Sequence, residues 1–246
     1  MRTPTLPSRL YAFDDLSAQD VQALLAGASI AATGASAALG NQHVAVLCEE
    51  PACESAHVLA AAASALGATV VRLRTSSLHL SDRPQVRETA RMLGRLYHLI
   101  GCEGLGSRVC AGLGRWAGVP VLSDVAATSH PTRILADLML MQECASRPAA
   151  QITLGLFDDT EAVALGAWHQ AAGLTGLRIV NLGQQSGDDG RPPCDFYFGH
   201  EPAGATQLPR HLVAVGSATG RSESLADRQR DAHRRLLQSL LTNLGG

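Results

Sequence analysis

Lysine is missing from this sequence, and all twenty basic residues among its 246 are arginines. A Schiff-base amine, a pyridoxal phosphate anchor and the lysine of a phosphate-binding loop all require that side chain, so enzymes built on lysine chemistry are excluded. The arginines form no basic tract and face twenty-two acidic residues, which gives capture of nucleic acid or anionic lipid little support. We therefore expect no nucleic-acid and no membrane partner, and a small neutral or anionic molecule is the favoured ligand.

Cysteine pairs and long apolar runs are missing as well. The six cysteines show no C-x-x-C spacing, and a chain of this length needs no disulfide framework, so free thiols are expected. The longest apolar run, residues 57–71, is rich in alanine and too short to span a bilayer. Prolines and aspartates interrupt the first fifteen residues before any apolar stretch begins. The sequence thus predicts a cytoplasmic protein.

Short apolar runs alternate with helical patterns along the chain. Residues 43–48 have no polar alternation, as expected of a strand that is covered on both faces of a parallel sheet. The repeat of strand and helix predicts parallel α/β sheets with right-handed crossovers. The predicted strands are 43–48, 69–73, 96–100, 119–122, 152–157, 177–181, 195–198 and 212–215, and the predicted helices are 17–28, 57–66, 85–93, 107–116, 131–144, 160–171 and 222–244.

Two motifs within residues 84–143 carry a family resemblance. Residues 86–97, V-R-E-T-A-R-M-L-G-R-L-Y, resemble the D-T-A-R-V-L-G-R-M-Y segment of ornithine carbamoyltransferases. Residues 130–138, H-P-T-R-I-L-A-D-L, are similar to the H-P-T-Q-x-L-A-D-L signature of the transcarbamylases. The chain therefore resembles the aspartate/ornithine carbamoyltransferase family, and ornithine carbamoyltransferase in particular. The resemblance is weaker from Ile152 onward.

The resemblance implies two parallel-sheet α/β domains of transcarbamylase type, with the second domain reduced and a C-terminal helix that returns to the first. We place the carbamoyl-phosphate-type domain at residues 1–146, the amino-acid-binding-type domain at 147–220 and the returning helix at 221–246. The family's usual assembly is a trimer, so a homotrimer is expected. Its active site lies at the carboxyl ends of the strands between the domains, where open α/β sheets bind their ligands.

Phosphate-binding residues of the family are replaced in this chain. The family holds carbamoyl phosphate on an S-T-R-T-R turn, which falls on residues 52–56, where Cys53, Glu54 and Ser55 stand and both arginines are absent. A further phosphate-side arginine falls on Glu103. His130 of the signature remains, but the glutamine three residues later is Arg133. A dianion needs amide dipoles and fork-shaped cations, so phosphate binding in the family's manner should fail.

The amino-acid side of the expected site is altered too. Residues 157–161, F-D-D-T-E, lack the asparagines that the family uses there, and no H-C-L-P segment is present. Near the C-terminus Gln229 falls where the family has an arginine, although a slip of one residue would bring Arg228 or Arg230 to that place.

These replacements predict an ornithine carbamoyltransferase-like protein that is catalytically inactive and binds a small metabolite or serves as a noncatalytic subunit. A divergent transferase or lyase acting on an amino acid-like substrate in the same interdomain cleft is the second hypothesis, and an active carbamoyltransferase is the third. We predict no cofactor, no metal and no catalytic residue. Arg133 either recognises a new anion or pairs with Glu54 or Glu103, and the pair is favoured because a buried carboxylate needs a partner. The candidate ligand-binding residues of this vestigial or repurposed cleft are Cys53, Glu54, Ser55, Glu103, His130 and Arg133.

Overall fold

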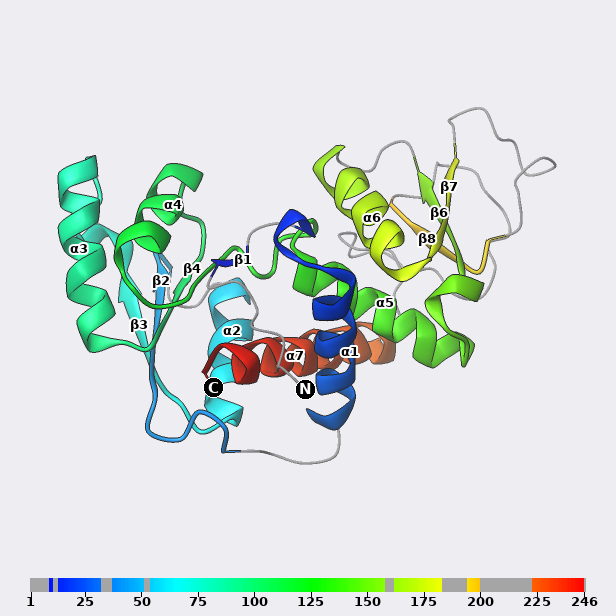
Figure 1. Ribbon diagram of the computed structural model, residues 1–246, viewed down its shortest axis with the longest axis horizontal. Coiled ribbons are helices and arrows are strands. Elements are labelled where there is room, and N and C mark those ends of the chain that lie inside the picture. Colours follow the sequence, from blue (N-terminus) through cyan, green and yellow to red (C-terminus); the bar gives the residue numbers. More distant parts are fainter. Residues whose placement is uncertain are drawn as a thin grey trace.

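Two separate parallel sheets form the framework of the computed structural model (Figure 1). It describes residues 9–10, 13–31, 37–50, 54–157, 162–182, 194–199 and 223–245. The larger sheet has the order β1-β5-β4-β2-β3, and all its neighbouring strands are parallel. Its strands are β1 (Arg9–Leu10), β2 (His43–Cys48), β3 (Thr69–Arg74), β4 (Leu99–Cys102) and β5 (Val121–Ser123).

Strand β2 separates two apolar cores because successive side chains of a strand point to opposite faces. Val44 and Val46 belong to the core under α2 (Glu54–Ala65), whereas Ala45 and Leu47 belong to the core under α3 (Arg83–Leu96) and α4 (Ser107–Trp116). All these strand residues are fully buried. The unbroken apolar run that predicted this strand therefore reflects helices on both faces of the sheet.

The smaller sheet has the order β7-β6-β8 and is also parallel. Its strands are β6 (Thr153–Phe157), β7 (Arg178–Leu182) and β8 (Phe196–Phe198), and α6 (Ala162–Thr175) follows β6. Trp168 of α6 is fully buried and packs edge-on against Phe198, with ring centroids 5.4 Å apart. The strand expected at residues 212–215 lies outside the described residues.

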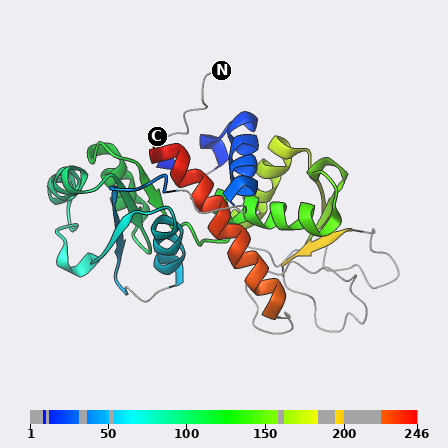
Figure 2. The same ribbon diagram turned by 90° about the horizontal axis from the view of Figure 1, so that it is seen from below.

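Helices α1 (Ala18–Ala31), α5 (Pro131–Ala145) and α7 (Glu223–Gly245) lie between the two sheets (Figure 1). The last of them, α7, crosses the molecule obliquely (Figure 2) and packs against α1, α2 and α5. Its apolar side chains Leu236, Leu237, Leu240 and Leu241 are buried. The helix thus returns to the first domain, as the resemblance implied.

The predicted β2 and α4 match at both ends, and the bounds of the other described elements are shifted by up to four residues. The strand predicted at 96–100 is β4 at Leu99–Cys102, because α3 continues to Leu96. Ser17 caps α1 through its hydroxyl, which accepts from the Asp20 N–H at 3.2 Å, while the Ser17 N–H donates to the Asp20 carboxylate at 2.8 Å. The sequence did not predict β1 or three short 3-10 helices, Phe13–Asp15, Thr75–Ser77 and Ala149–Gln151. The predicted α/β class with two parallel sheets is confirmed.

Candidate functional site

The candidate site residues gather at the carboxyl edge of the larger sheet, because they follow three parallel strands. Glu103 directly follows β4, Glu54 opens α2 after β2, and His130 precedes α5 after β5. The Glu103 N–H donates to the Leu47 carbonyl of β2 at 2.9 Å, and this hydrogen bond holds the backbone that follows β4 beside β2. Glu103 thus lies at the carboxyl end of its strand, while the grouping of all three side chains into one site stays a prediction. Cys53 lies outside the described residues, and Glu54 and Ser55 are described only as the first residues of α2.

Glu103 brings a carboxylate to a buried position at the end of β4. Its side chain is 4% exposed. The chain turns immediately afterwards at Gly104, whose φ of +71° suits glycine, and the Gly104 N–H donates to the Asp124 carboxylate at 2.8 Å. Asp124 itself follows β5 and donates its N–H to the Cys102 carbonyl at 2.8 Å. Two acidic residues therefore stand at the adjacent exits of β4 and β5.

His130 is the N-cap residue of α5. Its Nδ1 accepts from the Thr132 N–H at 3.3 Å and lies 2.8 Å from the Thr132 hydroxyl. This cap uses Nδ1 of His130 as an acceptor for the helix N-terminus. Pro131 occupies the first turn, where a missing N–H costs no hydrogen bond. The side chain is 4% exposed, so His130 serves the helix terminus as well as facing this edge of the sheet.

A second buried histidine joins this cluster from α7. Nε2 of His233 lies 3.2 Å from the Thr132 hydroxyl, which connects it through Thr132 to His130. Burial, together with the nearby charge of Arg133 and the proximity of His130, lowers the pKa of His233 to about 3. His233 is therefore neutral at physiological pH. No local sequence pattern signals this contact, because Thr132 and His233 are separated by 101 residues.

Arg133 approaches Asp137 one turn further along α5, with Nε 3.8 Å from Oδ2. Asp137 is fully buried and also accepts a hydrogen bond from the amide of Gln229 on α7. No ion pair within the described residues joins Arg133 to Glu103, while the other predicted partner, Glu54, has a side chain outside the described part of the chain, so that pairing stays a prediction. The i,i+4 spacing of Arg133 and Asp137 was the available signal.

Among residues 228–230 of α7, the buried one is Gln229. Gln229 is 4% exposed and contacts Asp137, whereas Arg228 and Arg230 are exposed. Arg230 pairs with Asp227 on the same helix. The inward-facing residue at this point of α7 is therefore a neutral amide and not an arginine.

Two thiols lie beneath the same edge. The Cys102 thiol is hydrogen-bonded to that of Cys110 on α4, and this bond and burial raise the pKa of Cys102 well above its usual range. The same bond lowers the pKa of Cys110, whose Sγ lies 3.5 Å from the Leu105 carbonyl.

Among the described residues no group of three or more His, Cys, Asp or Glu side chains is arranged to hold a metal ion. No described helix is long and apolar enough to cross a membrane.

A two-domain architecture of parallel sheets, bridged by α5 and closed by a C-terminal helix, defines the class of protein. The family model "Aspartate/ornithine carbamoyltransferase, carbamoyl-P binding domain" matches residues 9–143, more than half of the chain. The chain belongs to this family, and the resemblance seen in its motifs is confirmed.

Solved structures of carbamoyltransferases share the whole fold. Ornithine carbamoyltransferase from Thermus thermophilus superposes with a TM-score of 0.78 at 20% identity, covering 98% of this chain and 100% of that one. For the enzyme from Pyrococcus furiosus the TM-score is 0.74 at 17% identity, with 99% of each chain covered. The catalytic subunit of M. jannaschii aspartate transcarbamoylase gives 0.75 at 14% identity, covering 97% of this chain and 98% of that one. At these identities the likeness concerns the fold.

Proposed function

We propose that this chain is a catalytically inactive member of the carbamoyltransferase family, which keeps the scaffold to bind a small metabolite or to act as a noncatalytic subunit. The observation that carries the proposal is Glu103, a buried carboxylate at the end of β4, where the resemblance places a phosphate-binding arginine. Two like charges about 4 Å apart repel by about 4 kcal/mol at an effective dielectric constant of 20. A phosphate dianion beside Glu103 is therefore disfavoured.

Other charges around the site support the same conclusion. Arg133 lies near the buried Asp137 on its own helix, with Nε 3.8 Å from Oδ2, so part of its charge is offset by that carboxylate. Gln229 offers an amide where the resemblance implies a cation. His130 is retained, but its Nδ1 is committed to the N-terminus of α5. The retained histidine thus has a structural role that does not depend on carbamoyl transfer.

The first test measures citrulline formation from carbamoyl phosphate and ornithine by the purified protein. We expect no product above background, because residues 52–56 lack both arginines of the family motif and Glu103 adds a carboxyl group where an arginine is implied. Turnover well above background would overturn the proposal.

The second test attempts to restore phosphate binding. A triple variant, Glu54→Arg, Ala56→Arg and Glu103→Arg, is expected to show a rise in melting temperature with millimolar inorganic phosphate, without gaining turnover. The matched control is Glu103→Gln, which removes the buried charge without adding a cation and should show no phosphate-dependent rise. A phosphate-dependent rise in the unmodified protein would contradict the proposal.

A further inference from the structure

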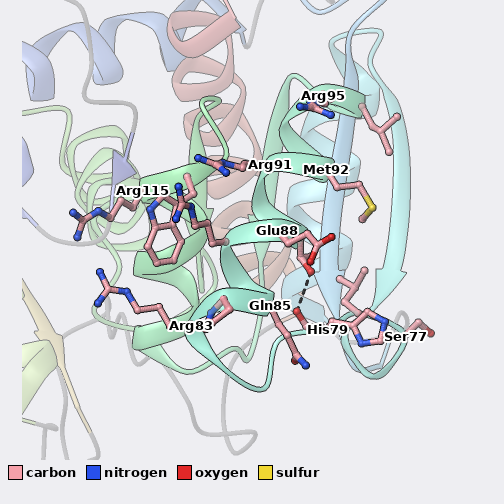
Figure 3. Close-up of a pocket in the computed structure, with 15 residues that line it drawn as sticks. Ser77, His79, Arg83, Gln85, Glu88, Arg91, Met92, Arg95 and Arg115 are labelled. Atoms are coloured by element: carbon pink, nitrogen blue, oxygen red, sulfur yellow. Dashed lines mark hydrogen bonds between the residues drawn. The ribbon is translucent and has the colours of Figure 1, made fainter.

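Helix α3 carries a line of arginines at a spacing of four residues, Arg83, Arg87, Arg91 and Arg95. Four residues advance a helix by about 6 Å and a little more than one turn, so these side chains follow one face. Arg115 of α4 borders the same groove, which has a volume of about 1580 Å³. Figure 3 shows Arg83, Arg91 and Arg115 gathered on one side of α3. We call these five residues the arginine stripe.

The arginine stripe has no internal electrostatic compensation. All five side chains are exposed, and none forms an ion pair with a carboxylate of a described residue. Arg83 and Arg115 instead lie over the ring of Trp116, at 5.6 and 5.8 Å from its centroid. The acidic residue of the groove is Glu88. The stripe and Glu88 together carry a charge of +4, whereas the whole chain carries −2, so the remaining residues carry −6.

This arrangement does not stabilise α3 itself. Like charges at i and i+4 repel on a helix surface, and a cation at Arg83 opposes the positive end of the helix dipole. The N-terminus is already capped by Asp82, whose carboxylate accepts from the Gln85 N–H at 2.9 Å. The stripe is thus a surface feature whose favourable contacts must come from outside the helix.

Exposed apolar side chains line the same groove as the stripe. Met92 is 46% and Leu96 is 58% exposed, and both line the groove. Figure 3 shows Met92 on the side of α3 opposite to Arg91. Arginine, methionine and tryptophan are enriched in protein interfaces, while interfaces with nucleic acid depend mainly on charge. The mixed composition favours a protein partner.

A second copy of this chain is a poor fit for the stripe. A two-fold contact would place arginines against arginines, and a head-to-tail contact, as in a trimer, would need an acidic surface elsewhere on the chain. Many carboxylates of the described surface are already engaged. Asp195 pairs with Arg147, Glu143 pairs with Arg235, and Asp227 and Asp231 pair with arginines of α7. These four carboxylates are therefore already neutralised by arginines of the same chain.

We propose that the arginine stripe of α3 and α4 is a docking site for an acidic partner protein, which presents a helix with carboxylates at i,i+4 spacing and apolar residues beside them. Such a helix repeats its charges at the same interval of about 6 Å as the stripe. Planar guanidinium groups bind carboxylates in a bidentate manner, and Met92 and Leu96 supply exposed apolar surface in the same groove. The arginine stripe lies on α3 and α4 and not at the carboxyl ends of the strands. The proposal therefore does not depend on whether the candidate site at those strand ends is catalytic.

The test uses a fluorescently labelled synthetic helical peptide with glutamate at every fourth position and leucine beside each glutamate. Anisotropy titrations with the full chain at low salt should show saturable binding that weakens as salt rises. The variant Arg87→Glu/Arg91→Glu should weaken binding at least tenfold. The matched control Arg178→Glu/Arg228→Glu changes the net charge equally at exposed positions outside the groove and should alter binding less than twofold. Melting curves verify that each variant is folded.

A third variant separates a protein partner from a nucleic acid. Met92→Ser/Leu96→Ser should weaken peptide binding at least threefold and leave any binding of a single-stranded oligonucleotide of equal charge unchanged. Tighter binding of the oligonucleotide than of the peptide would overturn the proposal, as would no peptide binding or equal loss in the control variant. Sedimentation of the Arg87→Glu/Arg91→Glu variant should match that of the unmodified chain. A loss of self-association would instead assign the stripe to contacts between copies.

Discussion

At the scale of single residues, the neutral His233 makes stability depend on pH. Its pKa is about 3 in the folded chain and about 6.5 when unfolded, so the unfolded state binds more protons between these values. Stability is therefore fully retained above about pH 6.5 and is lost as pH falls towards 3. One proton contributes about 1.4 kcal/mol per pH unit, which predicts a loss of about 2 kcal/mol from pH 6.5 to 5. Urea denaturation at several pH values measures this slope.

The control for this prediction is His233→Gln, which keeps a polar side chain beside Thr132 but cannot titrate in this range. We expect a lower stability at neutral pH and a slope reduced by about one proton between pH 6.5 and 5. An identical slope in both proteins would show that His233 does not carry the effect.

At the scale of elements, two helical glycines predict opposite responses to substitution. A Cβ on Gly94 of α3 would lie 1.8 Å from the Ala117 carbonyl oxygen, a backbone atom that cannot simply rotate away, whereas a Cβ on Gly166 of α6 would meet nothing within 4 Å. Alanine exceeds glycine in helix propensity by about 1 kcal/mol. Gly166→Ala should therefore raise the free energy of unfolding by about 0.5–1 kcal/mol. Gly94→Ala should lower it by about 1–3 kcal/mol through overpacking. A stabilised Gly94→Ala would refute the close approach of α3 to Ala117.

The elements also show what the sequence could and could not predict. Strand β2 and helix α4 were predicted at both ends, because an unbroken apolar run and a clear helical period are local signals. Strand β1 has two residues and no pattern to detect. The sequence suggested no basic tract, yet spacing by four residues brings the arginines of α3 to one face. Side-chain pairs were harder to predict. Arg133 was assigned to a distant carboxylate although Asp137 stood one turn away.

At the scale of the whole molecule, we propose that the chain forms a homotrimer, as the family resemblance implies. A reduced second domain gains from surface buried between subunits. Sedimentation velocity at micromolar concentration should give a mass of about three chains of 25.7 kDa. The Gly166→Ala variant, changed on an exposed face of α6, is a suitable control and should sediment identically. A monomer at this concentration would contradict the trimer.

The position of α7 also sets the order in which the chain can fold during its synthesis. The helix packs on α1 and α2, but α2 ends at Ala65 and α7 begins at Glu223. Ribosomes add about 5–20 residues per second, so the apolar faces of α1 and α2 stay uncovered for about 8–30 s until α7 has been synthesised. Buried residues such as Leu24 and Leu59 belong to the core that α7 completes. A nascent chain stalled before residue 223 therefore displays this surface to chaperones, and release of the last helix ends that exposure.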